Sequence, residues 1–217
     1  MTVEITGFDW VPDFAKGYVR DLRPRWACEE IGLPYRMRLL SAVAPRPADY
    51  FCEQPWGQVP VLTDGGITVF ESGAILLHLG EKDERLMPRD PAGRASVQSW
   101  LLAAYNSVEP HMFELANITL FAKDEEWAKL RRPSLMADAG ARFDRLADAI
   151  EGREWLAGTF SVADIAMATV LRLAGDTDLV SSRPALATYL DRALARPAFR
   201  RALDAQLADF KPEPVAA

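Results

Sequence analysis

The sequence has few of the residues that bind metals or form disulfide scaffolds. Its 217 residues include only two cysteines, Cys28 and Cys52, and two histidines, His78 and His111. The cysteines lack CxxC spacing, and the histidines belong to no metal-binding motif. A chain of this length buries roughly 70% of its unfolded surface, so it needs no cross-link to be stable. We therefore predict a protein without a metal or a disulfide framework.

Positive charge and long apolar runs are also scarce. The chain has 25 Lys and Arg against 31 Asp and Glu, a formal net charge of −6, whereas nucleic-acid binding requires an excess of basic side chains. No apolar run approaches the roughly 18 residues of a membrane span. The N-terminal stretch MTVEITGFDW lacks the basic and apolar regions of a signal peptide. These features predict a cytoplasmic protein with neither a nucleic-acid nor a membrane partner.

The pattern of apolar residues changes near residue 85. Before it, short β-like runs alternate with helical ones in the order β-α-β, then β-β-α. A helix joins the first two strands, which predicts a parallel pair, and a glycine turn over 63–66 joins the last two, which predicts an antiparallel pair. We expect an α+β fold with a four-stranded mixed sheet and helices at 1–83, a linker at 84–92 and an all-α bundle at 93–217.

Two features organise the predicted bundle. Residues 161–173 are apolar nearly all round, which predicts a buried central helix. Ser161 and Asp164 are spaced to form a capping box at its start, an interpretation that we prefer to a catalytic role for Asp164. Pro110 is predicted to kink or split the long helical stretch over 92–121.

Most of the functional signal lies in the segment PWGQVPVLTDGGITVFESGAILLHL, residues 55–79. Its extended stretch at Gln58 and Val59 offers backbone hydrogen bonds to a peptide. A helix that begins at Ser72 offers free N–H groups and a partial positive charge, which favour an anion. Together these elements predict a site for a small anionic peptide.

With these residues in view, the chain resembles the cytosolic glutathione S-transferase family of bacterial type. Four segments carry the resemblance in the family's order and spacing: RWACEEIGLPY at 25–35, QVPVL at 58–62, ESGAI at 71–75 and FSVADI at 160–165. The resemblance implies a thioredoxin-like N-terminal domain and an all-helical C-terminal domain for substrate binding and dimerisation. It also implies a homodimer that uses glutathione as co-substrate and needs no metal.

The resemblance also implies roles for five residues at a glutathione site. Val59 would pair its backbone with the cysteinyl unit, next to a cis-proline at Pro60, and Gln58 would contact the glycyl end. Glu71 would bind the ammonium of the γ-glutamyl end, and Ser72 its carboxylate. From the residues alone, Pro60 also fits an ordinary edge-strand proline, and Ser72 also fits a helix cap without a ligand.

The first loop departs from the family pattern. The family activates the glutathione thiol with a Ser, Tyr or Cys near the start of the first helix, but residues 7–24 contain no Ser or Cys. The family's position falls at Tyr18, which is the candidate hydroxyl donor, although a tyrosine there also fits a packing role. Of the three arginines Arg20, Arg23 and Arg25, Arg20 is the nearest to Tyr18 in sequence and the best candidate for a functional role. Asp21 is the expected N-cap of the helix.

The neighbouring basic residues have two interpretations. Arg20, Arg23 and Arg25 fit either a cluster that stabilises a thiolate or ordinary ion pairs on a solvated helix face, and we prefer the ion pairs. Cys28 is interpreted as a core thiol.

The resemblance implies that a small hydrophobic electrophile contacts the first two helices of the bundle. Tyr105, His111 and Met112 are the candidate contacts, and helical periodicity predicts that about half of such residues face the core. We predict a glutathione transferase that conjugates an unassigned electrophile in detoxification. The alternative is a non-catalytic protein of the same fold that binds or carries a ligand.

Overall fold

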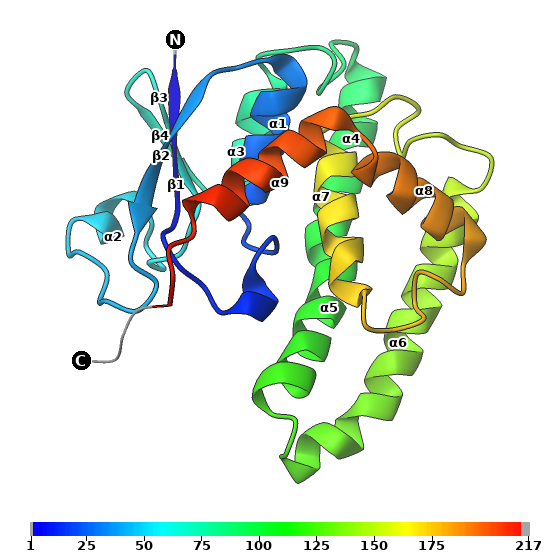
Figure 1. Cartoon of the computed structure of the whole chain (residues 1–217). Coiled ribbons are helices and arrows are strands. Elements are labelled where there is room, and N and C mark those ends of the chain that lie inside the picture. Colours follow the sequence, from blue (N-terminus) through cyan, green and yellow to red (C-terminus); the bar gives the residue numbers. More distant parts are fainter. Residues whose placement is uncertain (1, 214–217) are drawn as a thin grey trace. The chain divides into compact units, whose positions relative to one another are not determined.

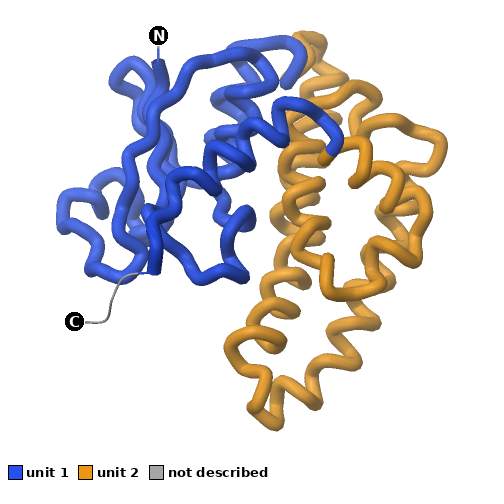
Figure 2. Tube along the Cα trace, in the orientation of Figure 1, with its two compact units in different colours: residues 1–86, 195–217 blue, residues 87–194 orange. Residues whose placement is uncertain are grey.

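The computed structural model describes residues 2–213 and divides into two compact units (Figure 2). The first unit comprises Met1–Leu86 and Ala195–Ala217, and the second comprises Met87–Leu194. The predicted domain limits, with a linker at 84–92, stay a prediction about how the chain is organised.

The first unit is built on a four-stranded mixed sheet with the strand order β2-β1-β3-β4. Strand β1 runs parallel to β2, and β3 runs antiparallel to both β1 and β4, so both predicted pairings are confirmed. Val3 and Ile5 of the first strand are fully buried, as are Val61 and Leu62 of the third. The strands are β1 (Val3–Phe8), β2 (Tyr35–Leu40), β3 (Val61–Asp64) and β4 (Ile67–Phe70).

Helices cover both faces of this sheet. Figure 1 shows α1, α3 and α9 on one side and the short α2 on the other. Trp26 of α1 is fully buried and packs edge-on against Phe199 of α9, with ring centroids 4.8 Å apart. Helix α1 ends at Gly32, which has a left-handed backbone (φ 69°) that glycine adopts without a Cβ clash. The helices are α1 (Leu22–Ile31), α2 (Tyr50–Glu53), α3 (Ser72–Gly80) and α9 (Pro197–Asp209).

The start of α1 differs in one respect from the prediction. Asp21 precedes the helix as expected, but its side chain caps no N–H group of the first turn. Its carboxylate instead accepts hydrogen bonds from Arg25 Nε at 2.8 Å and Gln206 Nε2 at 2.7 Å. The predicted N-cap position of Asp21 is confirmed, but its carboxylate is bonded to the buried Arg25 and to Gln206 and makes no capping hydrogen bond.

The second unit is entirely helical in its described elements. All ten residues of α7 are buried, which confirms the predicted central helix. The helix predicted over 92–121 widens into a π-helical turn at Ala104–Val108, just before Pro110. Proline lacks an N–H and its ring displaces the carbonyl four residues earlier, so the regular hydrogen-bond ladder cannot continue there. The elements are α4 (Pro91–Ala103), η2 (Ala104–Val108), α5 (Glu109–Ala116), η3 (Asn117–Phe121), α6 (Glu126–Ile150), α7 (Val162–Leu171), η4 (Arg172–Ala174) and α8 (Pro184–Leu194).

The capping box at the start of α7 is confirmed. Ser161 Oγ accepts from the N–H of Ala163, and the Asp164 carboxylate accepts from the N–H of Ser161 at 3.0 Å. The same carboxylate also accepts from the N–H of Leu156 at 3.1 Å and the hydroxyl of Tyr189 at 2.9 Å. Asp164 therefore links the segment around Leu156 and helix α8 to the central helix by hydrogen bonds. No helix in the described part of the chain is both long and apolar enough to cross a bilayer.

Candidate functional site

Residues 58–60 bend the chain into β3, and we call this segment the Val59–Pro60 turn. The Val59–Pro60 peptide bond is cis, as the family resemblance implies. Val59 and Pro60 are buried and the Gln58 side chain is exposed. Among the described residues, neither the N–H nor the C=O of Val59 takes part in a hydrogen bond. The Val59 backbone therefore offers a donor and an acceptor to a bound peptide.

The hairpin brings a second group of candidate residues to this turn. In the antiparallel register, Val61 of β3 pairs with Phe70 of β4. Because antiparallel strands run in opposite directions, Pro60 and Glu71 lie next to this pair at the same end of the hairpin. The candidate residues of the two segments are thus neighbours in space as well as in sequence.

Glu71 has the backbone conformation of a strained residue. Its φ is +68° and its ψ is 118°, a combination that residues with a Cβ rarely adopt. Its side chain is exposed and does not cap α3, while its carbonyl accepts from the N–H of Ile75 at 2.9 Å. The Glu71 carboxylate is thus turned to the surface beside the N-terminus of α3.

Ser72 is the first residue of α3, and it is buried. Arg23 Nη1 of α1 donates a hydrogen bond to Ser72 Oγ at 3.3 Å, and the Arg23 side chain is buried too. A helix N-terminus with a buried guanidinium beside it has the electrostatics that favour a carboxylate. The sequence interpretation of Arg23 as a solvated cation is therefore wrong, and no spacing in the sequence links positions 23 and 72.

Tyr18 and Arg20 lie in the loop before α1, where the sequence placed them. A short 3-10 turn, η1 (Asp13–Ala15), precedes them. The N–H of Tyr18 donates to the Ala15 carbonyl at 3.0 Å, and its side chain is 44% exposed. The carbonyl of Arg20 accepts from the N–H of Arg23 at 3.1 Å. The hydroxyl of Tyr18 is therefore within the loop that the family uses for its donor, and that role stays a prediction.

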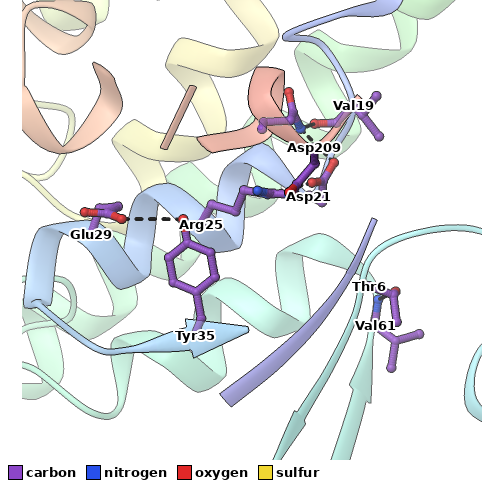
Figure 3. A network of polar contacts seen from close by, with 9 residues as sticks. Thr6, Val19, Asp21, Arg25, Glu29, Tyr35, Val61 and Asp209 are labelled. Carbon is purple, nitrogen blue, oxygen red and sulfur yellow. Dashed lines mark hydrogen bonds and ion pairs between the residues drawn. The ribbon is translucent and has the colours of Figure 1, made fainter. Parts of the chain in front are cut away.

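A buried ion cluster fixes the end of this loop (Figure 3). Arg25 Nε contacts Asp21 Oδ2 at 2.8 Å, and Arg25 Nη2 contacts Asp209 Oδ2 of α9 at 2.6 Å. Gln206 Nε2 donates to Asp21 Oδ1 at 2.7 Å and to the Val19 carbonyl at 3.1 Å. Burial raises the pKa of Asp21 to about 6, although the Arg25 charge opposes this shift. Arg25 is 1% exposed, so its ion pairs are not on a solvated face, as the sequence had suggested.

The candidate electrophile contacts lie in the second unit. Tyr105 belongs to the π-helical turn η2, and His111 lies in the first turns of α5. Both side chains are half-buried. Met112 is fully buried in the core of this unit. The part that these three residues play toward an electrophile stays a prediction.

The cysteines lie outside the first loop. Cys28 is fully buried in α1, as interpreted from the sequence, and burial raises its pKa to about 12. Cys52 is exposed on α2, and both thiols are free. Within residues 2–213, no three His, Cys, Asp or Glu side chains are grouped in a way that could hold a metal ion.

Comparisons with known proteins identify the family of this chain. Residues 14–81 match the family described as glutathione S-transferase, N-terminal domain. The glutathione S-transferase GstA of Escherichia coli O157:H7 is 30% identical over 166 residues, which are 73% of this chain and 78% of GstA. The chain belongs to the glutathione S-transferase family, and its fold is a thioredoxin-like domain followed by a helical domain.

Solved structures show the same fold. A glutathione transferase family member from Pseudomonas fluorescens Pf-5, solved with two glutathione bound, has a TM-score of 0.81 and 25% identity, covering 93% of this chain and 92% of that one. A glutathione transferase from Burkholderia graminis, with two glutathione molecules bound per subunit, has a TM-score of 0.80 and 27% identity, covering 94% and 88%.

Proposed function

We propose that this protein is a glutathione transferase that binds glutathione on its first unit and activates the thiol for attack on a small hydrophobic electrophile. The observation that carries the proposal is the register of the β3–β4 hairpin. It sets the unpaired backbone of Val59 next to Glu71 and the N-terminus of α3. The structures from Pseudomonas and Burkholderia that contain glutathione support the choice of ligand.

The proposed binding mode uses opposite charges at the two ends of the γ-glutamyl group. The exposed carboxylate of Glu71 binds the ammonium. The Ser72 hydroxyl and the N–H groups of α3 bind the carboxylate, helped by the buried guanidinium of Arg23. The Val59 backbone pairs with the cysteinyl unit in antiparallel fashion, beside Pro60, and Gln58 contacts the glycyl end.

The proposed catalytic step is stabilisation of the thiolate. A free thiol has a pKa of about 8.5, so only a small fraction is thiolate at neutral pH. A hydrogen bond donated by the Tyr18 hydroxyl favours the charged form, and the positive charge of Arg20 acts in the same direction. The thiolate sulfur then forms a bond with the electrophilic carbon and displaces its leaving group or adds to it. Tyr105 and His111, which are half-buried, are the proposed contacts of that electrophile, whereas the fully buried Met112 lies behind them in the core.

Conjugation is preferred over thiol–disulfide exchange. In this family exchange generally relies on a cysteine near the start of the first helix, and residues 7–24 contain none. The exposed Cys52 lies on α2, outside this loop. Cys28 is buried with its pKa raised to about 12. The nucleophile in this proposal is therefore the glutathione thiol alone.

Binding and thiol activation are tested in sequence. Retention on immobilised glutathione and isothermal calorimetry measure binding. Ultraviolet titration of the bound thiolate then measures its pKa. The proposal expects binding together with a thiol pKa well below that of free glutathione. A protein that neither is retained nor gives heat with glutathione contradicts the ligand assignment.

The second candidate is a non-catalytic binding or carrier protein of the same fold. It is favoured by one observation, the absence of Ser and Cys from residues 7–24. The same titration separates the two, because a carrier binds glutathione without lowering its thiol pKa. The homodimer and the cytoplasmic location are proposed from the family resemblance, and equilibrium sedimentation tests the dimer.

A further inference from the structure

A chain of three hydrogen bonds encloses the Val59–Pro60 turn. The Tyr50 hydroxyl of α2 lies 2.7 Å from the Gln58 carbonyl oxygen and 3.0 Å from Thr6 Oγ1 of β1. The N–H of Val61 donates to the same Thr6 oxygen at 2.7 Å. Figure 3 shows Thr6 beside Val61. Side chains from two other elements therefore hold both ends of the segment 58–61.

The direction of every bond in this chain is fixed by chemistry. A carbonyl oxygen only accepts, so the single hydroxyl proton of Tyr50 must go to Gln58. Tyr50 then accepts the proton of Thr6, and Thr6 in turn accepts from the N–H of Val61. The order is Val61 N–H to Thr6, Thr6 to Tyr50, and Tyr50 to Gln58. Each hydroxyl both donates and accepts, so the bonds strengthen one another.

Because the peptide unit is planar, these hydrogen bonds also set the direction of the Val59 N–H group. The carbonyl of Gln58 and the N–H of Val59 belong to one planar peptide unit, in which the two bonds point in opposite directions. Fixing the Gln58 oxygen against Tyr50 therefore directs the Val59 N–H to the opposite side. This is the N–H that has no partner among the described residues.

Burial keeps the Tyr50 hydroxyl bonded to the Gln58 carbonyl. Its side chain is 2% exposed and that of Thr6 is 1% exposed, so water does not replace a lost bond. Burial raises the pKa of Tyr50, which keeps its hydroxyl protonated and able to donate. Arg46 Nε donates to the neighbouring Gly57 carbonyl at 3.0 Å, which holds the preceding peptide in place as well.

We propose that Tyr50 and Thr6 are positioning residues that orient the Val59 backbone toward the cysteinyl unit of glutathione. This inference rests on the proposed function, because it assumes that glutathione is the peptide bound at Val59. Neither side chain touches the ligand in this scheme, and both act through the Gln58–Val59 peptide unit.

The test compares glutathione dissociation constants, measured by calorimetry well below the melting temperature of every variant. Tyr50→Phe and Thr6→Val each remove one hydroxyl at nearly constant volume. Each is expected to weaken glutathione binding about tenfold, the effect of one misdirected hydrogen bond. Because the bonds act in series, the double variant is expected to bind no more weakly than either single variant. Thr6→Ser keeps the hydroxyl and is expected to retain the affinity of the original protein.

Tyr189→Phe is the matched control. Tyr189 is a buried tyrosine of the second unit whose hydroxyl donates to Asp164. Loss of the Tyr189 hydroxyl is expected to lower the melting temperature and to leave glutathione affinity unchanged. If Tyr50 had only a structural role, Tyr50→Phe would give the same result.

The outcomes separate the two proposals. If the original protein binds glutathione and both Tyr50→Phe and Thr6→Val bind it equally well, the positioning role is overturned and the proposed function stands. If the original protein does not bind glutathione, both proposals fail. Should Tyr50→Phe not fold, Thr6→Val and Thr6→Ser provide the same comparison.

Discussion

Arg25 and Asp209, 184 positions apart in the sequence, form an ion pair of 2.6 Å between Nη2 and Oδ2. The Arg25 guanidinium also contacts the buried Asp21, so one arginine links the loop before α1 to the end of α9. A buried charge without its partner destabilises the folded state, so the stability of the first unit depends on Arg25.

Replacing Arg25 with Met tests this dependence. The change leaves the Asp21 carboxylate buried without its cation, and we expect the free energy of unfolding to fall by about 3–5 kcal/mol. Arg201→Met is the control, because the Arg201 pair with Glu29 is exposed and such pairs contribute about 1 kcal/mol or less. Urea denaturation measures both, and equal losses would contradict the assigned importance of the buried cluster.

The strained backbone at Glu71 predicts that stability and binding change in opposite directions. Glu71→Gly relieves the positive φ and is expected to raise the free energy of unfolding by about 1 kcal/mol, since relieved strain exceeds the added chain entropy. Glu71→Ala keeps the strain. Both variants lose the carboxylate and are expected to bind glutathione more weakly. A glycine variant less stable than the alanine variant would refute the strain argument.

Ser72 is proposed to bind the γ-glutamyl carboxylate with its hydroxyl. Ser72→Ala is expected to raise the glutathione dissociation constant about 10- to 100-fold, because a hydrogen bond to a charged group contributes roughly 1.5–3 kcal/mol and the helix N–H groups remain. Ser99→Ala provides the matched control, since Ser99 is an exposed helical serine of α4 that bonds only the Ala95 carbonyl. Calorimetry that gives the same constant for both variants would exclude the hydroxyl contact.

Tyr18 is the proposed donor to the sulfur. Tyr18→Phe is expected to raise the pKa of the bound thiol and to lower kcat/KM roughly 100-fold for a test electrophile, the scale of losing one well-placed hydrogen-bond donor. Tyr35→Phe removes another hydroxyl of the first unit, one that donates to Glu29 at 3.4 Å, and is expected to leave both quantities unchanged. Unaltered turnover in Tyr18→Phe would remove Tyr18 from the mechanism.

Asp164 predicts a pH dependence of stability with a definite sign. Burial raises its pKa from 3.8 to about 6 in the folded protein, despite four donated hydrogen bonds. Between these values the folded protein holds a proton that the unfolded chain has released, so this group's contribution to stability falls as pH rises. The loss is on the order of 3 kcal/mol across that window.

Asp164→Asn removes this titration. The unfolding free energy of the original protein minus that of the variant is expected to decrease from about pH 4 to about pH 7. Taking the difference cancels every group that the two proteins share. A difference that stays constant or increases over this range would show that Asp164 is not the buried acid described.

Local patterns predicted much of the fold, because strand alternation, the glycine hairpin and the capping box are all decided within a few residues. Val59, Glu71 and Ser72 lie in one continuous motif, so the sequence could nominate them together, and their role at a glutathione site stays a prediction. Contacts between distant segments were not predictable in this way. Arg23 reaches Ser72 across 49 positions, and no local pattern records that approach.

The support of the Val59 turn shows the same limit. Thr6 and Tyr50 read as ordinary strand and helix residues, and they meet only because the sheet and α2 pack together. Asp21 shows how a local expectation is overridden. Asp21 stands at the N-cap position, yet its carboxylate accepts hydrogen bonds from the buried Arg25 and Gln206 and not from an N–H group of the first helical turn.

The chain leaves its first unit at Leu86 and returns to it at Ala195. During synthesis, the residues that build the sheet therefore emerge from the ribosome long before helix α9, which supplies Phe199 to pack against Trp26 and Asp209 to pair with Arg25. The second unit is one continuous segment and can fold as soon as it is made. The first unit becomes complete only when the last helix has been translated, so a premature stop that removes α9 damages the part of the protein encoded first.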